Sequence, residues 1–159
     1  MNDGYAKMRM TLTLFAAGAA LAGCSKEPDV SIKAFMANEV QPTAEVYWNA
    51  VQFISDETGD HDIRPQTDEE WQKVADAAAK LAEHGRMLKE PGYAEGRGQG
   101  WIEFSDGLIE VAGKAEAAAN SKDPDAVFEV GGTVYSVCSA CHQAYPPADA
   151  PEEMGNAAG

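Results

Sequence analysis

The run Cys138-Ser139-Ala140-Cys141-His142 carries the clearest chemistry in the sequence. Cysteines at positions i and i+3 of a helix lie on one face, and the next residue stands close beside them. C-x-x-C-H is the spacing at which a c-type haem is attached, with two thiols bonded to the porphyrin and the imidazole bound to the iron. The motif therefore predicts one covalent haem c, attached through Cys138 and Cys141, with His142 as an iron ligand.

Two other kinds of site also use a closely spaced pair of cysteines. A thioredoxin-like redox pair needs a βαβ context, and no strand pattern precedes this motif. A zinc site needs a second pair of ligands, and the remaining cysteine, Cys24, is far away in the sequence. Both alternatives have less support from the residues than haem has.

The N-terminus has the three parts of an export signal. Lys7 and Arg9 form a short basic region, residues 11–20 are apolar, and small residues follow. The apolar part is too short to span a bilayer as a mature helix, so the pattern predicts a signal peptide.

The end of this segment, Leu21-Ala22-Gly23-Cys24, resembles a bacterial lipobox. The resemblance implies cleavage after Gly23 and lipidation of Cys24. The alternative is an ordinary secretory signal followed by a chance cysteine. Because Ser25 stands where lipoproteins retained in the inner membrane have Asp, we expect a periplasmic protein anchored to the outer membrane.

Cysteine usage and charge agree with this interpretation. One lipid anchor and two thioethers would use all 3 cysteines, which is an awkward number for a secreted protein that relies on disulfides. The formal net charge is −14, and the signal segment contributes none of this acidity. Such a chain is not expected to bind nucleic acid or an anionic lipid surface, although its acidity could steer it toward basic redox partners.

Helical periodicity runs through the remainder of the chain, and no alternation typical of strands is visible. The expected helices begin near Asp29, behind a capping box at Thr67, at Trp101, and behind the N-cap Asp123. The first is expected to continue to Ile54 with a bend at Pro42, and a polar loop to follow over residues 56–65. The other three are expected to end near residues 90, 120 and 146.

Four such helices with short polar loops predict an all-α fold, an antiparallel up-down four-helix bundle. The predicted organisation is a signal peptide over residues 1–23, a lipidated tether over 24–28, the haem-binding bundle over 29–146, and a disordered tail over 147–159. Four aromatic residues at core spacing are expected to be buried, and two histidines are expected at the surface. The aromatic residues are Trp48, Trp71, Trp101 and Tyr135, and the histidines are His61 and His84.

A C-x-x-C-H motif on the last of four helices resembles the class II c-type cytochromes. The resemblance covers essentially the whole mature chain and assigns the haem cysteines and the proximal histidine to Cys138, Cys141 and His142. The family comprises cytochrome c′, whose iron is five-coordinate, and relatives whose sixth ligand is a methionine on the first helix. Met36 lies about where the family has that distal residue.

The sixth ligand decides between two functions. With Met36 on the iron, thioether ligation opposite histidine raises the reduction potential and suits an electron carrier. Without it, the protein would be a five-coordinate cytochrome c′ that binds nitric oxide or carbon monoxide. A methionine on an apolar stripe can also be a core residue, and Met87 and Met154 are weaker candidates for the ligand.

No set of distal acid and base residues is recognisable, so an enzyme is not expected. The expected partners are redox proteins, the membrane that holds the lipid anchor and, if the bundle self-associates, a second copy in a homodimer.

Overall fold

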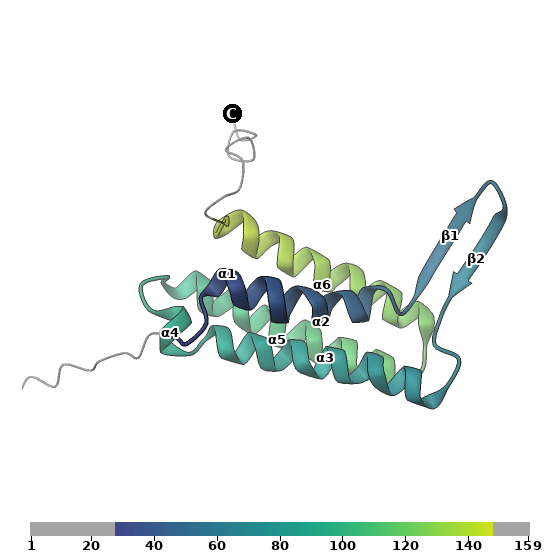
Figure 1. The fold of residues 1–159 in the computed structure, drawn as a ribbon, viewed down its shortest axis with the longest axis horizontal. Helices are drawn as coiled ribbons and strands as arrows, with labels where there is room; N and C mark the ends of the chain where they lie inside the picture. The colour runs from purple at the N-terminus through teal and green to yellow at the C-terminus, as the bar shows by residue number, and fades with distance from the viewer. Residues whose placement is uncertain (1–27, 148–159) are drawn as a thin grey trace, which may run out of the picture.

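Helices make up most of the computed structural model, which describes residues 28–147. A small two-stranded sheet interrupts them and projects from one end of the molecule (Figure 1). The elements in chain order are α1 (Ile32–Phe35), the π-helical turn η1 (Met36–Val40), α2 (Gln41–Trp48), β1 (Gln52–Asp56), β2 (Gly59–Ile63), α3 (Asp68–Leu88), α4 (Pro91–Ala94), α5 (Gln99–Asn120) and α6 (Pro124–Ala144).

The first helical segment, α1–η1–α2, starts at Ile32 rather than near Asp29. Ser31 caps it, because its hydroxyl oxygen accepts the backbone N–H of Ala34 at 3.2 Å. The segment continues past Pro42, and the backbone widens just before that residue, where the N–H of Gln41 donates to the carbonyl of Met36. Proline has no N–H for the carbonyl four residues earlier and its ring crowds that group, so a wider turn accommodates it.

The prediction that this helix reaches Ile54 is wrong, and so is the prediction of a structureless loop over residues 56–65. The helix ends at Trp48, and residues 52–63 form an antiparallel hairpin in which Gln52 pairs with Ile63. Gly59 supports the tight turn with φ of +125°, a value that side-chain-bearing residues rarely adopt. Nearly every residue of both strands is exposed, so the sequence contains no buried apolar face to reveal them.

The predicted starts of the second and fourth long helices are confirmed. At α3, the N–H of Glu70 donates to the Thr67 hydroxyl oxygen at 3.2 Å, and the N–H of Thr67 donates to the Glu70 carboxylate at 3.0 Å. At α6, Asp123 accepts the N–H of Ala126 at 3.1 Å. The helix α5 ends at Asn120 as expected, whereas the short helix α4 was not anticipated.

The long helices lie side by side, with α5 between α3 and α6, and with α2 against both α3 and α6 (Figure 1). Small residues bring α3 and α5 close together. A Cβ added at Gly85 would lie 2.7 Å from Ile109 Cγ1 and 3.2 Å from the Ser105 carbonyl oxygen, so a larger residue would push the helices apart. The core continues along both helices through Leu81 and a series of buried alanines, and burial of this apolar surface stabilises the packing.

Burial corrects two side-chain predictions. Tyr135 is 63% exposed rather than part of the core, and His84 is 3% exposed rather than at the surface. Trp71 and Trp101 are buried as expected, and Trp48 is half-buried. His61 is exposed on the hairpin, as expected.

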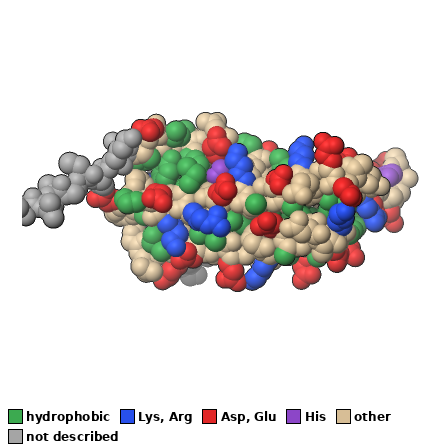
Figure 2. All heavy atoms as spheres, turned by 90° about the horizontal axis from the view of Figure 1, so that it is seen from below, with side chains coloured by type: hydrophobic (Ala, Val, Ile, Leu, Met, Phe, Trp, Pro, Cys, Tyr) green, Lys and Arg blue, Asp and Glu red, His purple; other side chains and the backbone are tan. Residues whose placement is uncertain are grey.

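Acidic and basic side chains are interspersed over the face of the molecule seen in Figure 2. None of the helices within residues 28–147 is both long enough and apolar enough to cross a membrane.

Candidate functional site

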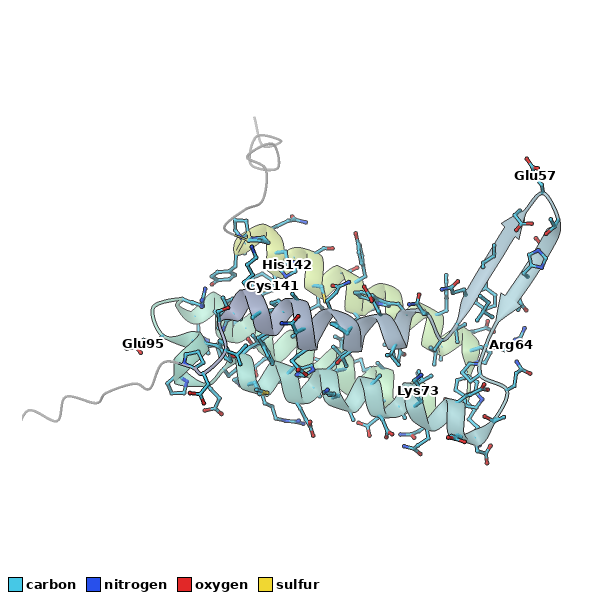
Figure 3. All side chains as sticks on the ribbon, viewed as in Figure 1. Glu57, Arg64, Lys73, Glu95, Cys141 and His142 are labelled. Atoms are coloured by element: carbon cyan, nitrogen blue, oxygen red, sulfur yellow. The ribbon has the colours of Figure 1, made fainter. Side chains whose placement is uncertain are left out.

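The last turns of α6 present the C-x-x-C-H residues at the end of the molecule opposite the hairpin tip, as Cys141, His142 and Glu57 show in Figure 3. The helix persists to Ala144, and the N–H of Tyr145 closes the last turn on the Cys141 carbonyl at 2.8 Å. The motif therefore keeps helical spacing throughout. Cys138 and Cys141 are half-buried and free, whereas His142 is exposed.

A cavity of about 480 Å³ lies beside these residues, and its lining brings together distant parts of the chain. Met36 lines it, together with Cys138, Cys141 and His142. The three residues of the motif and Met36, which the family resemblance suggested as a further haem ligand, therefore line one cavity. The other lining residues come from α2 and η1, from α3, α5 and from α6 itself: Val40, Gln41, Ala44, Trp48, Leu88, Trp101, Phe104, Ser105, Leu108, Tyr135, Val137, Ser139 and Gln143.

The walls of this cavity are largely apolar, and several of their polar atoms are already paired with backbone carbonyls. The indole N–H of Trp101 donates to the Leu88 carbonyl at 2.6 Å, and the Ser105 hydroxyl donates to the Trp101 carbonyl at 2.8 Å. The indole N–H of Trp48 donates to the Gly131 carbonyl at 3.0 Å. Because these donors are satisfied, the rings of the two tryptophans offer apolar surface to a bound group.

The two thiols differ from those of a redox-active pair. Burial raises the pKa of Cys138, and the neighbouring Cys141 raises it further. Burial also raises the pKa of Cys141. Catalytic disulfide pairs show the opposite shift, because their chemistry needs a thiolate at neutral pH.

The donor set fits a c-type haem. The motif offers two thiols on one helical face and an imidazole next to them, and Met36 adds a thioether from another helical segment to the same apolar cavity. In the part of the chain that the structure describes, no group of three or more His, Cys, Asp and Glu residues could hold a bare metal ion.

Some candidate residues do not join this site. Met87 is 43% exposed on α3 and does not line the cavity, and neither does the buried His84. Met154 and Cys24, the latter with the predicted signal and lipid anchor, lie outside the described residues.

Part of the cavity lining does not follow from the sequence. Trp48 and Trp101 were expected in the core, yet they line the cavity, and so does Phe104. A stripe alone does not distinguish packing against a helix from packing against a bound group, so it gave no signal. Pro42 did give a signal for the π-helical turn, which begins six residues earlier at Met36.

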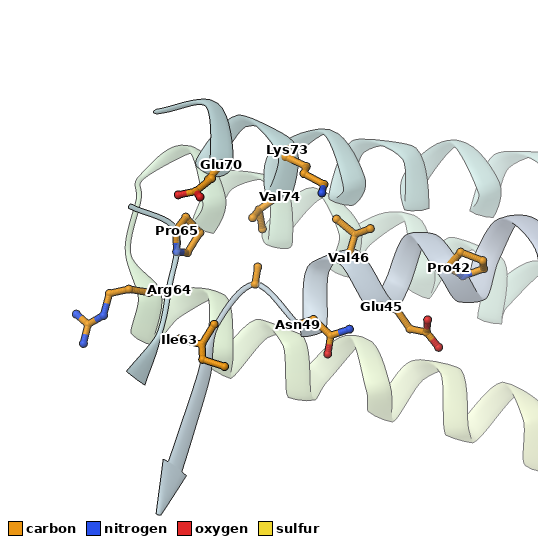
Figure 4. A pocket seen from close by; sticks show the side chains of 11 residues that line it. Pro42, Glu45, Val46, Asn49, Ile63, Arg64, Pro65, Glu70, Lys73 and Val74 are labelled. Carbon is orange, nitrogen blue, oxygen red and sulfur yellow. The ribbon is translucent and has the colours of Figure 1, made fainter. Parts of the chain in front are cut away.

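A second cavity, of about 470 Å³, lies at the base of the hairpin between α2 and α3. Figure 4 shows its lining, which includes Pro42, Glu45, Ile63, Glu70 and Lys73. It contains none of the C-x-x-C-H residues, and its charged groups offer no recognisable catalytic or haem-binding set. The cavity beside α6 is therefore the candidate functional site.

No protein-family model, curated protein or solved structure matches this chain. The functional proposal is therefore based on the residues of the site and their arrangement.

Proposed function

We propose that the protein is a c-type cytochrome that carries electrons through one haem attached in the cavity beside α6. The single observation that supports this most strongly is that Met36 lines the same cavity as Cys138, Cys141 and His142. In this proposal the segment α1–α2 and the helices α3, α5 and α6 are the members of a four-helix bundle around the haem.

The four residues have two kinds of role in the proposal. Cys138 and Cys141 would bond the porphyrin as thioethers and so hold it on α6. His142 and Met36 would supply a nitrogen and a sulfur as ligands to its iron. The bound haem supplies an iron that alternates between the ferrous and ferric states.

The cavity walls would support this role. Trp48, Trp101 and Phe104 exclude water from around the haem, and a dry, apolar surrounding influences the reduction potential together with the axial ligands. His142 and Met36, each held by its own helical segment, would both stay bound in either oxidation state of the iron, and such constancy favours rapid electron transfer. The proposal assigns no catalytic residue.

The cellular location of the protein is part of the proposal. The signal segment and Cys24 support export and lipid anchoring on the periplasmic side of the outer membrane. The partners would then be redox proteins of that compartment, and the acidity of the chain favours basic ones.

The test is haem retention by the protein produced in a host that attaches c-type haem. After denaturation and extraction with acidic organic solvent, haem should stay with the wild-type polypeptide, because thioethers are covalent. Retention should disappear when Cys138→Ala and Cys141→Ala are combined. Cys24→Ala is the matched control, since it removes a cysteine outside the site and should leave retention unchanged. Release of haem from the wild type would overturn the proposal.

A further inference from the structure

A buried polar pair lies directly beside the π-helical turn that begins at Met36. The hydroxyl of Thr43 donates to the carbonyl of Glu39 at 2.7 Å, and its oxygen lies 3.3 Å from Nε2 of His84 on α3. Thr43 is 7% exposed and His84 is 3% exposed, so both side chains are largely shielded from water. The pair thus connects a carbonyl of η1 to α3.

The protonation of the pair follows from its geometry. The Thr43 hydroxyl has one proton, which it gives to Glu39, so its oxygen can only accept from His84. His84 therefore carries its proton on Nε2, and its other ring nitrogen, Nδ1, has no hydrogen-bond partner among residues 28–147. A buried polar atom without a partner costs stability, so a histidine here needs a reason other than packing.

The charges around the ring favour the neutral form that this arrangement needs. Burial lowers the pKa of His84, and Lys80 on α3 lowers it further. Glu83, also on α3, and Glu39 on η1 act in the opposite direction, and so does the Glu39 backbone. The net shift is downward.

The π-helical turn explains what the pair could be for. Pro42 has no N–H, and the turn before it is wider than an α-helical turn. The Thr43 hydroxyl satisfies the Glu39 carbonyl within this turn. His84 also contacts Phe35, the residue before Met36. The two rings pack edge to face, with 5.2 Å between their centroids.

We propose that His84 and Thr43 are positioning residues that hold the π-helical turn so that the Met36 side chain stays in the haem cavity. The inference rests on the proposed function, since it assigns these residues to the methionine ligand of that site. They act through Met36 and touch neither the haem nor its cysteines.

The test compares purified holoprotein variants with and without the polar link. Thr43→Val and His84→Leu remove it, whereas Thr43→Ser keeps the hydroxyl and His84→Gln keeps an N–H donor near the position of Nε2. Thr133→Val is the matched control, since Thr133 also donates to the carbonyl four residues earlier, Glu129, but does so on the exposed face of α6.

The readouts are the weak far-red band of ferric iron bound to a thioether, the affinity for carbon monoxide, and hydrogen exchange at the Gln41 amide. Carbon monoxide has to displace the sulfur, and the Gln41 amide donates to Met36. Loss of one hydrogen bond should raise both the carbon monoxide affinity and the exchange rate about fivefold in the disrupting variants. The conservative variants and Thr133→Val should match the wild type.

A double variant adds a second test. If the two residues act as one link, Thr43→Val combined with His84→Leu should change the carbon monoxide affinity no more than either substitution alone.

The outcomes separate this inference from the proposed function. A wild-type protein with the far-red band, whose band and carbon monoxide affinity are unchanged in both disrupting variants, overturns the positioning role and leaves the proposed function standing. If the disrupting variants unfold at a lower midpoint but keep the band and the carbon monoxide affinity of the wild type, the two residues have a purely structural role, and the positioning role is likewise overturned. A wild type that retains haem but lacks the band overturns the Met36 ligand and the positioning role with it.

Discussion

Met36 on η1 and His142 on α6 line one cavity, although they come from opposite ends of the described chain. No covalent bond or local sequence constraint brings these two residues together. Their proximity depends on how the helical segments pack. The axial ligands proposed for the haem therefore depend on the correct packing of α2 against α6.

Met36→Ala is expected to convert the iron from low-spin to high-spin, because the alanine offers no sulfur. The far-red band should disappear, the reduction potential should fall, and carbon monoxide affinity should rise on the order of tenfold or more, as for the loss of a competing bond worth about 1.4 kcal/mol. Absorption spectra, redox titration and gas titration measure these changes. Met87→Ala, which shortens an exposed methionine, is the control and should behave as wild type. A high-spin wild type that takes up carbon monoxide freely would instead indicate a five-coordinate, gas-binding protein.

Cys24→Ser is expected to release the protein from the membrane. A hydroxyl cannot take the thioether-linked lipid, so the variant should appear in the soluble periplasmic fraction with its haem still attached. Cell fractionation followed by detection of haem in each fraction measures this. Equal partitioning of the two forms would contradict lipid anchoring, and haem retention in both would leave the cytochrome proposal intact.

Stability should depend on pH through His84. Its pKa in the folded protein lies below the ordinary value of 6.5, so the unfolded chain takes up the proton first as pH falls. The free energy of unfolding therefore decreases as pH falls from above 6.5 toward the lowered pKa. The His84→Gln variant should lose less of this free energy over the same pH range. Urea denaturation of both proteins between about pH 7.5 and about pH 5 tests the difference. If the free energy of unfolding of the two proteins falls equally with pH, the His84 ring is not buried in its neutral form.

The sequence allowed a good prediction of the starts of α3 and α6. Thr67 and Asp123 are side-chain caps whose hydrogen bonds depend on residues three positions away, so local sequence is enough to identify them. The C-x-x-C-H residues also follow from local spacing. Their meeting with Met36 was expected from resemblance to a family, and the shared cavity supports that expectation.

The failures have two physical origins, which are tertiary packing for the side chains and the lack of a buried apolar face for the hairpin. His84 is buried because Phe35 and Thr43 of the first helical segment pack against its ring, and a polar residue type does not reveal this. Tyr135 continues the helical pattern of α6 and lines the cavity, but it is largely exposed there and packs edge to face with Trp48 at a centroid distance of 6.1 Å. The hairpin escaped prediction because its strands bury no continuous apolar face.

The pairing of Gln52 with Ile63 brings together the two ends of the connection between α2 and α3. Beyond that pair, the strands could be lengthened or shortened at the Glu57–Thr58 turn without changing the path of either helix, because the added residues would pair with one another. The length of this segment is thereby uncoupled from the geometry of the cavity. Related chains could differ widely here and still share one site, and an engineered tag inserted at the turn would leave that site intact.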